Sequence, residues 1–119
     1  MSVDVHIPGL RLDVTPNARL HWAARAKRVK RQRAIIALIL APHRRALPAL
    51  PVVVTITRCS PGTMDDDNAT ASAKAVRDAV AEHLGVDDRD PRVTWRVEQR
   101  RAPWGASISI APRPQTTER

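Results

Sequence analysis

The chain contains no phenylalanine and no tyrosine, and its aromatic residues are limited to Trp22, Trp95 and Trp104. The apolar 43% of its 119 residues is therefore mostly alanine, valine, isoleucine and leucine, which predicts an aliphatic core. A chain of this length is expected to form one hydrophobic core. We therefore expect a single domain over residues 1–112, followed by a disordered polar tail over residues 113–119.

Cysteine and long apolar runs are also scarce. The single cysteine, Cys59, excludes an intramolecular disulfide and a zinc site built from several cysteines. The most apolar run covers residues 35–41, far short of the ~20 residues that span a bilayer. The first residues lack the basic-then-apolar pattern of an export signal. We therefore expect a cytoplasmic protein with no membrane partner.

Acidic residues are outnumbered by basic ones, 12 against 20, and the net charge is +8. Seven of the basic residues lie between Arg19 and Arg33, whereas eight of the acidic residues lie between Asp65 and Asp90. A basic protein attracts polyanions because binding releases their counterions, so nucleic acid is the expected partner. The acidic region opposes that attraction unless a divalent cation neutralises it.

The spacing of apolar residues predicts an α+β fold, in which two main helices pack on a small mixed β-sheet. The β-branched run at residues 52–58 predicts a central strand, and the last two strands are expected to form a hairpin. Trp22 stands at helical spacing and is expected in the core; stacking on a nucleobase is the alternative. The expected order is a strand within 3–12, a helix over 19–41, a strand over 52–58, a helix over about 68–84, and strands over 92–101 and 106–110.

Two acidic segments flank the second predicted helix: Asp65-Asp66-Asp67-Asn68 before it and Asp87-Asp88-Arg89-Asp90 after it. Capping that helix requires one of these side chains at most, with Asp67 or Asn68 as the candidate cap. Mg²⁺ binds carboxylate oxygens, and an extended segment would point Asp65 and Asp67 to the same side. The helix would be ~25 Å long, so the two segments can meet only if the strand after it pairs with residues 52–58. The alternative is acid placed to suit the helix dipole.

Three motifs in this region stand in a fixed order. They are Asp65-Asp66-Asp67-Asn68, then Lys74-Ala75-Val76-Arg77-Asp78-Ala79-Val80, then Leu84-Gly85-Val86-Asp87-Asp88, followed by Val93. Their order and spacing resemble the signature of the RusA-like Holliday-junction resolvases of bacteria and their phages. The turn Thr15-Pro16-Asn17 after the first strand is also similar to that family.

The resemblance implies a homodimer that binds four-way DNA junctions during recombination and repair and nicks them with Mg²⁺ or Mn²⁺, with no small-molecule cofactor. It assigns the catalytic, metal-binding carboxylates to Asp65, Asp67 and Asp88, and a catalytic lysine to Lys74. The helical spacing would place Lys74 on one face with Asp67, two turns away. The alternative for Lys74 is an exposed lysine paired with Asp78.

The residues beside these carboxylates have weaker assignments. Asn68 and Asp87 are expected to support the ligands from outside. Asp87 or Asp90 could replace Asp88 as the third ligand. The separation of Asn68 and Lys74 exceeds that of compact family members.

The DNA-binding surface is expected on the first helix, because its basic residues fall on more than one helical face and cannot all be buried. A solvated helix without a partner is the alternative. Arg58, just before the acidic motif, is expected to add to this surface. The helical residues are Arg25, Lys27, Arg28, Lys30, Arg31 and Arg33.

Two other functions remain open at this stage. One is a catalytically silent DNA-binding or recombination-accessory protein of the same fold, in which the carboxylates are caps or bind a structural ion. The other is a nuclease that cuts flaps or replication forks instead of junctions.

Overall fold

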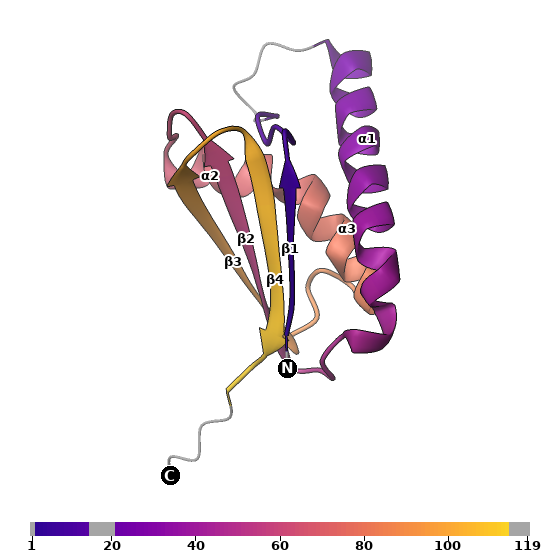
Figure 1. Cartoon of the computed structure of the whole chain (residues 1–119). Coiled ribbons are helices and arrows are strands. Elements are labelled where there is room, and N and C mark those ends of the chain that lie inside the picture. The colour runs from indigo at the N-terminus through magenta and orange to yellow at the C-terminus, as the bar shows by residue number, and fades with distance from the viewer. Residues whose placement is uncertain (1, 15–20, 115–119) are drawn as a thin grey trace.

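In the computed structural model, which describes residues 2–14 and 21–114, a four-stranded mixed sheet carries its helices on one face (Figure 1). The α+β class expected from the sequence is confirmed. The elements are β1 (Val3–Pro8), α1 (Trp22–Leu40), the 3₁₀ helix η1 (Ala41–Ala46), β2 (Val52–Ser60), α2 (Asp66–Ser72), α3 (Lys74–Leu84), β3 (Val93–Arg101) and β4 (Gly105–Pro112).

The strands lie in the order β1-β4-β2-β3. β2 runs parallel to β3 and antiparallel to β4, so the prediction that residues 52–58 form an interior strand is confirmed. The predicted hairpin of the last two strands is wrong, because β2 separates β3 from β4. The link between them passes over the end of β2, where the Ala102 amide donates to the Ser60 carbonyl at 3.1 Å.

Alternate residues of all four strands face the helices and form the aliphatic core. Ile36 and Leu40 of α1 are fully buried against it, with Ile35 and Ile39 partly buried beside them. From the sheet, the α3 helix and the segment after β1, the fully buried residues include Leu12, Val52, Val54, Ile56, Val76, Val80 and Ile110.

The first half of α1 lies outside this core, and in Figure 1 its N-terminal end rises beyond the ends of the strands. Trp22 is the first residue of α1 and is 76% exposed, so the expectation that it lies in the core is wrong. Helical spacing places Trp22 on the same side of α1 as the buried Ile36. Trp22 is nevertheless exposed, because this end of α1 extends beyond the strands whose side chains form the core.

The predicted second helix is interrupted at Ala73, which separates α2 from α3. The buried Ser72 hydroxyl donates to the Ala69 carbonyl at 2.7 Å, and the Ala73 amide bonds to the Thr70 carbonyl at 3.2 Å. Such side-chain bonds compete with the helical pattern and bend it. The α3 helix ends at Gly85, whose φ of 75° is the left-handed conformation expected of glycine there.

Three predictions fall outside the described residues: the helix start near Arg19, the turn Thr15-Pro16-Asn17, and the disorder of residues 115–119. Across the residues that the structure describes, no helix has both the length and the apolar character needed to span a membrane.

Candidate functional site

The first acidic segment forms the start of α2. Asp65 is the N-cap, where its Oδ1 accepts from the Asn68 amide at 2.8 Å and its Oδ2 from Asn68 Nδ2 at 3.2 Å. The cap is therefore Asp65, not Asp67 or Asn68, and the Asn68 side chain donates to the capping carboxylate. Asp66 and Asp67 are exposed in the first helical turn, so the alternation of an extended chain does not apply to them.

The loop that leads to this segment is fastened by Arg58. Its Nε donates to the Leu12 carbonyl at 2.8 Å, and one of its terminal nitrogens donates to Ser60 Oγ at 2.6 Å and to the Gly62 carbonyl at 3.3 Å. The side chain is 4% exposed and is unavailable to phosphate, so the prediction that Arg58 contacts DNA is wrong. Loss of hydration lowers the pKa of the Arg58 guanidinium, and the charge of Asp13 opposes that shift.

Gln99 of β3 also holds this loop. The Met64 amide donates to Gln99 Oε1 at 3.0 Å, and Gln99 Nε2 donates to the Met64 carbonyl at 2.7 Å. Gln99 lies beside Arg58 in the register of the sheet, on the face that carries the helices. These two side chains fix the backbone directly before Asp65.

The second acidic segment is held against the same face of β3 by Trp95. The Asp88 carbonyl accepts from Trp95 Nε1 at 3.0 Å and from a terminal nitrogen of Arg77 at 3.1 Å. Arg77 also places its Nε 3.7 Å from Asp88 Oδ2 and its Cζ 5.0 Å from the centre of the Trp95 ring. An arginine of α3 therefore occupies the position beside the Asp88 carboxylate.

Both acidic segments are thus attached to β3, at residues four positions apart on one face. Four residues of a strand correspond to about 13 Å. The pairing of β2 with β3, on which any approach of the two segments depends, is present. Within residues 2–14 and 21–114, however, no group of three or more histidine, cysteine, aspartate or glutamate side chains is arranged to hold a metal ion. Asp65, Asp67 and Asp88 are not gathered around one point.

The two neighbours of Asp88 form local turns. Asp90 accepts from the Arg92 amide at 2.9 Å and from the Arg92 guanidinium at 2.7 and 3.0 Å, and these bonds lower its pKa to about 2. Asp87 Oδ1 accepts from the Arg89 amide at 2.8 Å; this bond, and then a contact with the Asp88 side chain, lower the Asp87 pKa. Asp90 is committed to Arg92, whereas Asp87 contacts Asp88 in the way a supporting residue would.

Lys74 is the first residue of α3, not a member of the Asp67 helix, so the one-face argument that joined them is wrong. Its Nζ lies 3.4 Å from Asp78 Oδ1, and its side chain is 70% exposed. This is the ion pair that the sequence analysis kept as the alternative. Both residues line a pocket of about 330 Å³ between α1 and the α2–α3 junction, together with Arg25, Gln32 and Ser72.

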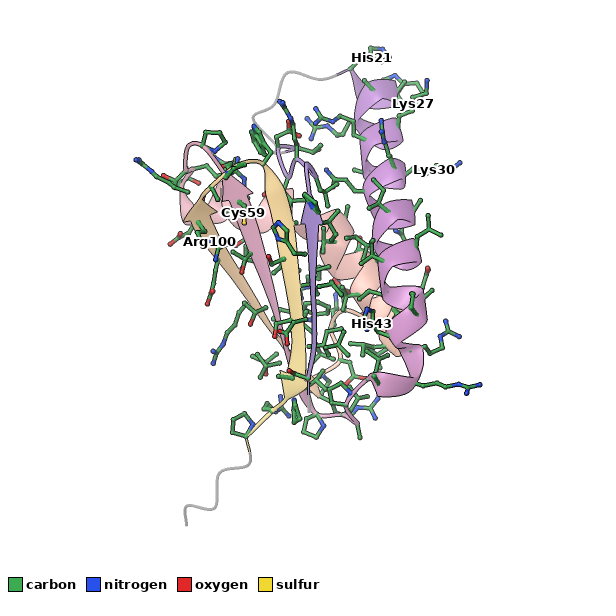
Figure 2. The ribbon with its side chains drawn as sticks, viewed as in Figure 1. His21, Lys27, Lys30, His43, Cys59 and Arg100 are labelled. Atoms are coloured by element: carbon green, nitrogen blue, oxygen red, sulfur yellow. The ribbon has the colours of Figure 1, made fainter. Side chains whose placement is uncertain are left out.

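The basic residues predicted to form the DNA surface on α1 fall into two groups, those in ion pairs and those exposed to solvent. Arg28 pairs with Asp13, and Arg33 lies 3.5 Å from Glu82. Lys27 and Lys30 are exposed, and Figure 2 shows them on the side of α1 away from the sheet. Arg31 is also exposed, and Arg25 is partly buried. The helix carries no acidic residue between Trp22 and Leu40.

No protein-family model matches the chain. The chain is similar to an uncharacterized protein of Xylella fastidiosa, with 38% identity over 86 residues that cover 65% of this chain and 54% of that protein. The chain thus spans about half the length of this relative.

Gln99, Trp95 and Arg77 are the site residues that the sequence analysis missed. Gln99 had a signal, because it is the polar member of an alternating inward-facing series with Val93, Trp95 and Val97. A polar side chain at such a position requires a hydrogen-bonding partner inside the fold. Arg77 had no comparable signal, because its partner is a backbone carbonyl that folds back from beyond the helix.

Proposed function

We propose that this chain is a RusA-like endodeoxyribonuclease that cleaves branched DNA with a divalent cation, acting as a homodimer. The order of the acidic motifs supports this proposal. The single observation that carries it is the attachment of both acidic segments to one face of β3, through Gln99 and Trp95. That attachment fixes both backbones on one surface, at strand residues about 13 Å apart, so that side-chain and loop movements would decide whether the carboxylates meet.

The three carboxylates have the right chemistry for the proposed cation, but they are not arranged around one point in this structure. Asp65, Asp67 and Asp88 offer the hard oxygen ligands that Mg²⁺ and Mn²⁺ accept. A bound cation would stabilise the charge that develops when a phosphodiester is hydrolysed. Asp67 has no hydrogen bond or ion pair in the described part of the chain, whereas Asp88 would have to exchange Arg77 for the cation. Arg77 therefore opposes closure of the site.

The chain's own residues would supply the binding of DNA. Lys27, Lys30 and Arg31 project from a helix without acidic residues, where they can contact phosphates of several helical arms. Such contacts read the shape of a junction without reading base edges. A homodimer would present this surface twice, which suits a branched substrate.

The test compares two neighbouring aspartates in a junction-cleavage assay with Mg²⁺. Asp67→Asn removes a proposed ligand that has no structural partner, so we expect its cleavage rate to fall at least about a hundredfold because the electrostatic stabilisation of the reaction is lost. Asp66→Asn is the matched control. It is equally exposed in the same helical turn, and we expect its cleavage rate to stay within about threefold of the wild type.

Thermal unfolding of both variants shows whether the fold is kept. Equal cleavage by the wild type and Asp67→Asn would contradict the proposed site. The absence of cleavage by the wild type with Mg²⁺ and with Mn²⁺ would contradict the nuclease proposal itself. Junction, flap, fork and linear duplex are compared at one salt concentration, because binding to DNA depends steeply on ionic strength.

A second candidate is a DNA-binding protein without catalytic activity, and specific contacts favour it. Asp65 caps α2, Lys74 pairs with Asp78, and Asp88 pairs with Arg77, so each has a structural role without any metal. This candidate predicts junction binding that is unchanged by Mg²⁺ and by Asp67→Asn, with no cut strands.

A further inference from the structure

The three tryptophans of the chain have different surroundings. Trp104 carries two guanidinium groups over its ring, those of Arg11 at 5.1 Å and Arg58 at 5.2 Å. Trp95 has Arg77 over its ring and gives its indole N–H to Asp88. Among the residues that the structure describes, the Trp22 ring has neither kind of partner; its ring contact is with His21, at 5.5 Å between centroids and with planes tilted by 33°.

Trp22 is also open to solvent. It is 76% exposed, and three of the four residues that follow it on α1 are alanines, Ala23, Ala24 and Ala26. These small side chains leave a shallow hollow beside the ring, lined also by His21, Lys27 and Lys30. A planar ligand could therefore approach the indole without displacing any larger side chain.

The cations of this hollow define the charge of its ligand. Lys27 and Lys30 lie five and eight residues beyond Trp22, which corresponds to about 7.5 and about 12 Å along the helix. Neither lysine has a hydrogen bond or ion pair in the described part of the chain, and α1 has no acidic residue. A ligand that fits this hollow would therefore have a flat group against the Trp22 ring and negative charges near Lys27 and Lys30. The distance from the flat group to these charges is comparable to the spacing of successive phosphates.

A second copy of the chain fits this surface poorly. A twofold contact centred on Trp22 would place Lys27 and Lys30 of one copy close to the same lysines of the other. Like charges brought together in this way weaken association. A nucleic acid has the opposite charge and an aromatic face on every base.

We propose that Trp22 stacks on an unpaired nucleobase while Lys27 and Lys30 bind the phosphates that flank it. Stacking on an aromatic side chain accepts any base, because every base has a π-face. The site would recognise bases that are unpaired at a branch point or in a single strand. This inference deepens the proposed function by naming the part of the DNA bound, but it requires binding only, and not cleavage.

The test measures binding to a single-stranded oligonucleotide and to a blunt duplex of the same length, in EDTA so that no strand is cut. We expect Trp22→Ala to bind the single strand about tenfold more weakly, as the loss of one stacked base predicts, and to bind the duplex within about twofold of the wild type. Trp22→Phe keeps an aromatic face and should recover most of the lost affinity. Leu38→Ala is the matched control, because Leu38 is 74% exposed on the same helix, and it should change neither affinity.

The lysines are tested by the salt dependence of the same binding. The double variant Lys27→Gln with Lys30→Gln should lower the slope of log affinity against log salt by about 1.4, as expected for the loss of two single-strand phosphate contacts. Wild-type affinity of Trp22→Ala for the single strand would overturn the proposal, as would an equal loss for the duplex. A dimer in sedimentation that Trp22→Ala converts to a monomer would overturn it in favour of a second copy. If the binding results are as expected but the wild type does not cleave DNA, the nuclease proposal is rejected and the stacking proposal stands.

Discussion

The Asp90 carboxylate accepts three hydrogen bonds, and all of them come from Arg92. These bonds hold the turn that leads into β3, and they lower the pKa of Asp90 from 3.8 to about 2. The sequence offered Asp90 as a substitute for Asp88 in the proposed metal site. Its commitment to Arg92 makes it a poor candidate, because a cation would have to displace a guanidinium and a backbone amide together.

The Asp90 contact predicts a specific dependence of stability on pH. A carboxylate whose pKa is depressed by folding stabilises the fold above its unfolded pKa, and that contribution is lost as the pH falls through the folded value. We therefore expect the wild type to be more stable than Asp90→Asn at pH 5, and the difference to disappear as the pH approaches 2. Urea denaturation across this range measures it.

Glu98→Gln is the control for that series, because Glu98 is exposed on the outer face of β3. It should show no such convergence with the wild type. A wild-type advantage over Asp90→Asn that is the same at pH 2 and pH 5 would contradict the assigned pKa shift.

Arg77 is the residue on which the chemistry of Asp88 depends. Its Nε is buried without a hydrogen-bond partner and lies 3.7 Å from the Asp88 carboxylate, beyond hydrogen-bonding distance. A buried donor left without a bond is unfavourable. The ion pair is therefore weaker than a bidentate one would be, and Asp88 can exchange Arg77 for another cation at a correspondingly smaller cost.

At the scale of elements, the path from β2 to α2 is held by β3. Gln99 bonds to both backbone groups of Met64, the residue before the Asp65 cap. We predict that Gln99→Ala frees this loop, so that the Met64 amide exchanges with solvent at least about tenfold faster, because loss of a hydrogen bond costs about 1.4 kcal/mol. Hydrogen exchange followed by NMR measures this rate.

Gln99→Glu separates the two bonds, because a carboxylate keeps the acceptor for the Met64 amide but has no donor for the Met64 carbonyl. The Met64 amide should then remain protected to a greater degree than in Gln99→Ala. In the proposed nuclease, both variants should cleave more slowly while binding DNA normally. Unchanged exchange at Met64 in Gln99→Ala would contradict the role of Gln99.

Local patterns in the sequence predicted the elements that depend on neighbours along the chain. The β-branched run of β2, the buried end of α1 and the stop at Gly85 follow from spacing and composition alone. The hairpin prediction failed because the choice of partner for β4 depends on which strand is most apolar, and β2 took the interior position. The prediction of one uninterrupted helix over about 68–84 failed for a similar reason, since Ser72 bends the helix only where its hydroxyl is buried.

The site shows the same division. Composition and motif order made the carboxylates candidates for a metal site, because three adjacent aspartates exceed what a helix cap needs, and that assignment stays a prediction. The groups that hold them, Gln99, Trp95 and Arg77, depend on the register of β3 against β2 and on a loop that folds back. Arg58 was misassigned because a basic residue beside an acidic motif is equally able to bind carbonyl oxygens inside the fold.

At the scale of the whole molecule, the basic cluster of α1 and the two acidic segments lie on different elements. Lys27, Lys30 and Arg31 project from α1, whereas the acidic segments are attached to β3, the edge strand farthest from β1 in the sheet, which itself carries Arg96, Arg100 and Arg101. DNA drawn to α1 would therefore need to extend across the molecule to reach the acidic segments. This separation is compatible with a substrate that has several arms, and it places the attraction and the proposed chemistry at different points.

The most direct measurement is a crystal structure of the chain soaked in Mn²⁺, with anomalous scattering used to locate the ion. We predict a peak within coordination distance of the Asp67 and Asp88 carboxylates, with the Arg77 side chain moved away from Asp88, and no such peak in Asp67→Asn. Crystals of wild-type protein that show no peak there, with Arg77 still beside Asp88 at saturating Mn²⁺, would contradict the account.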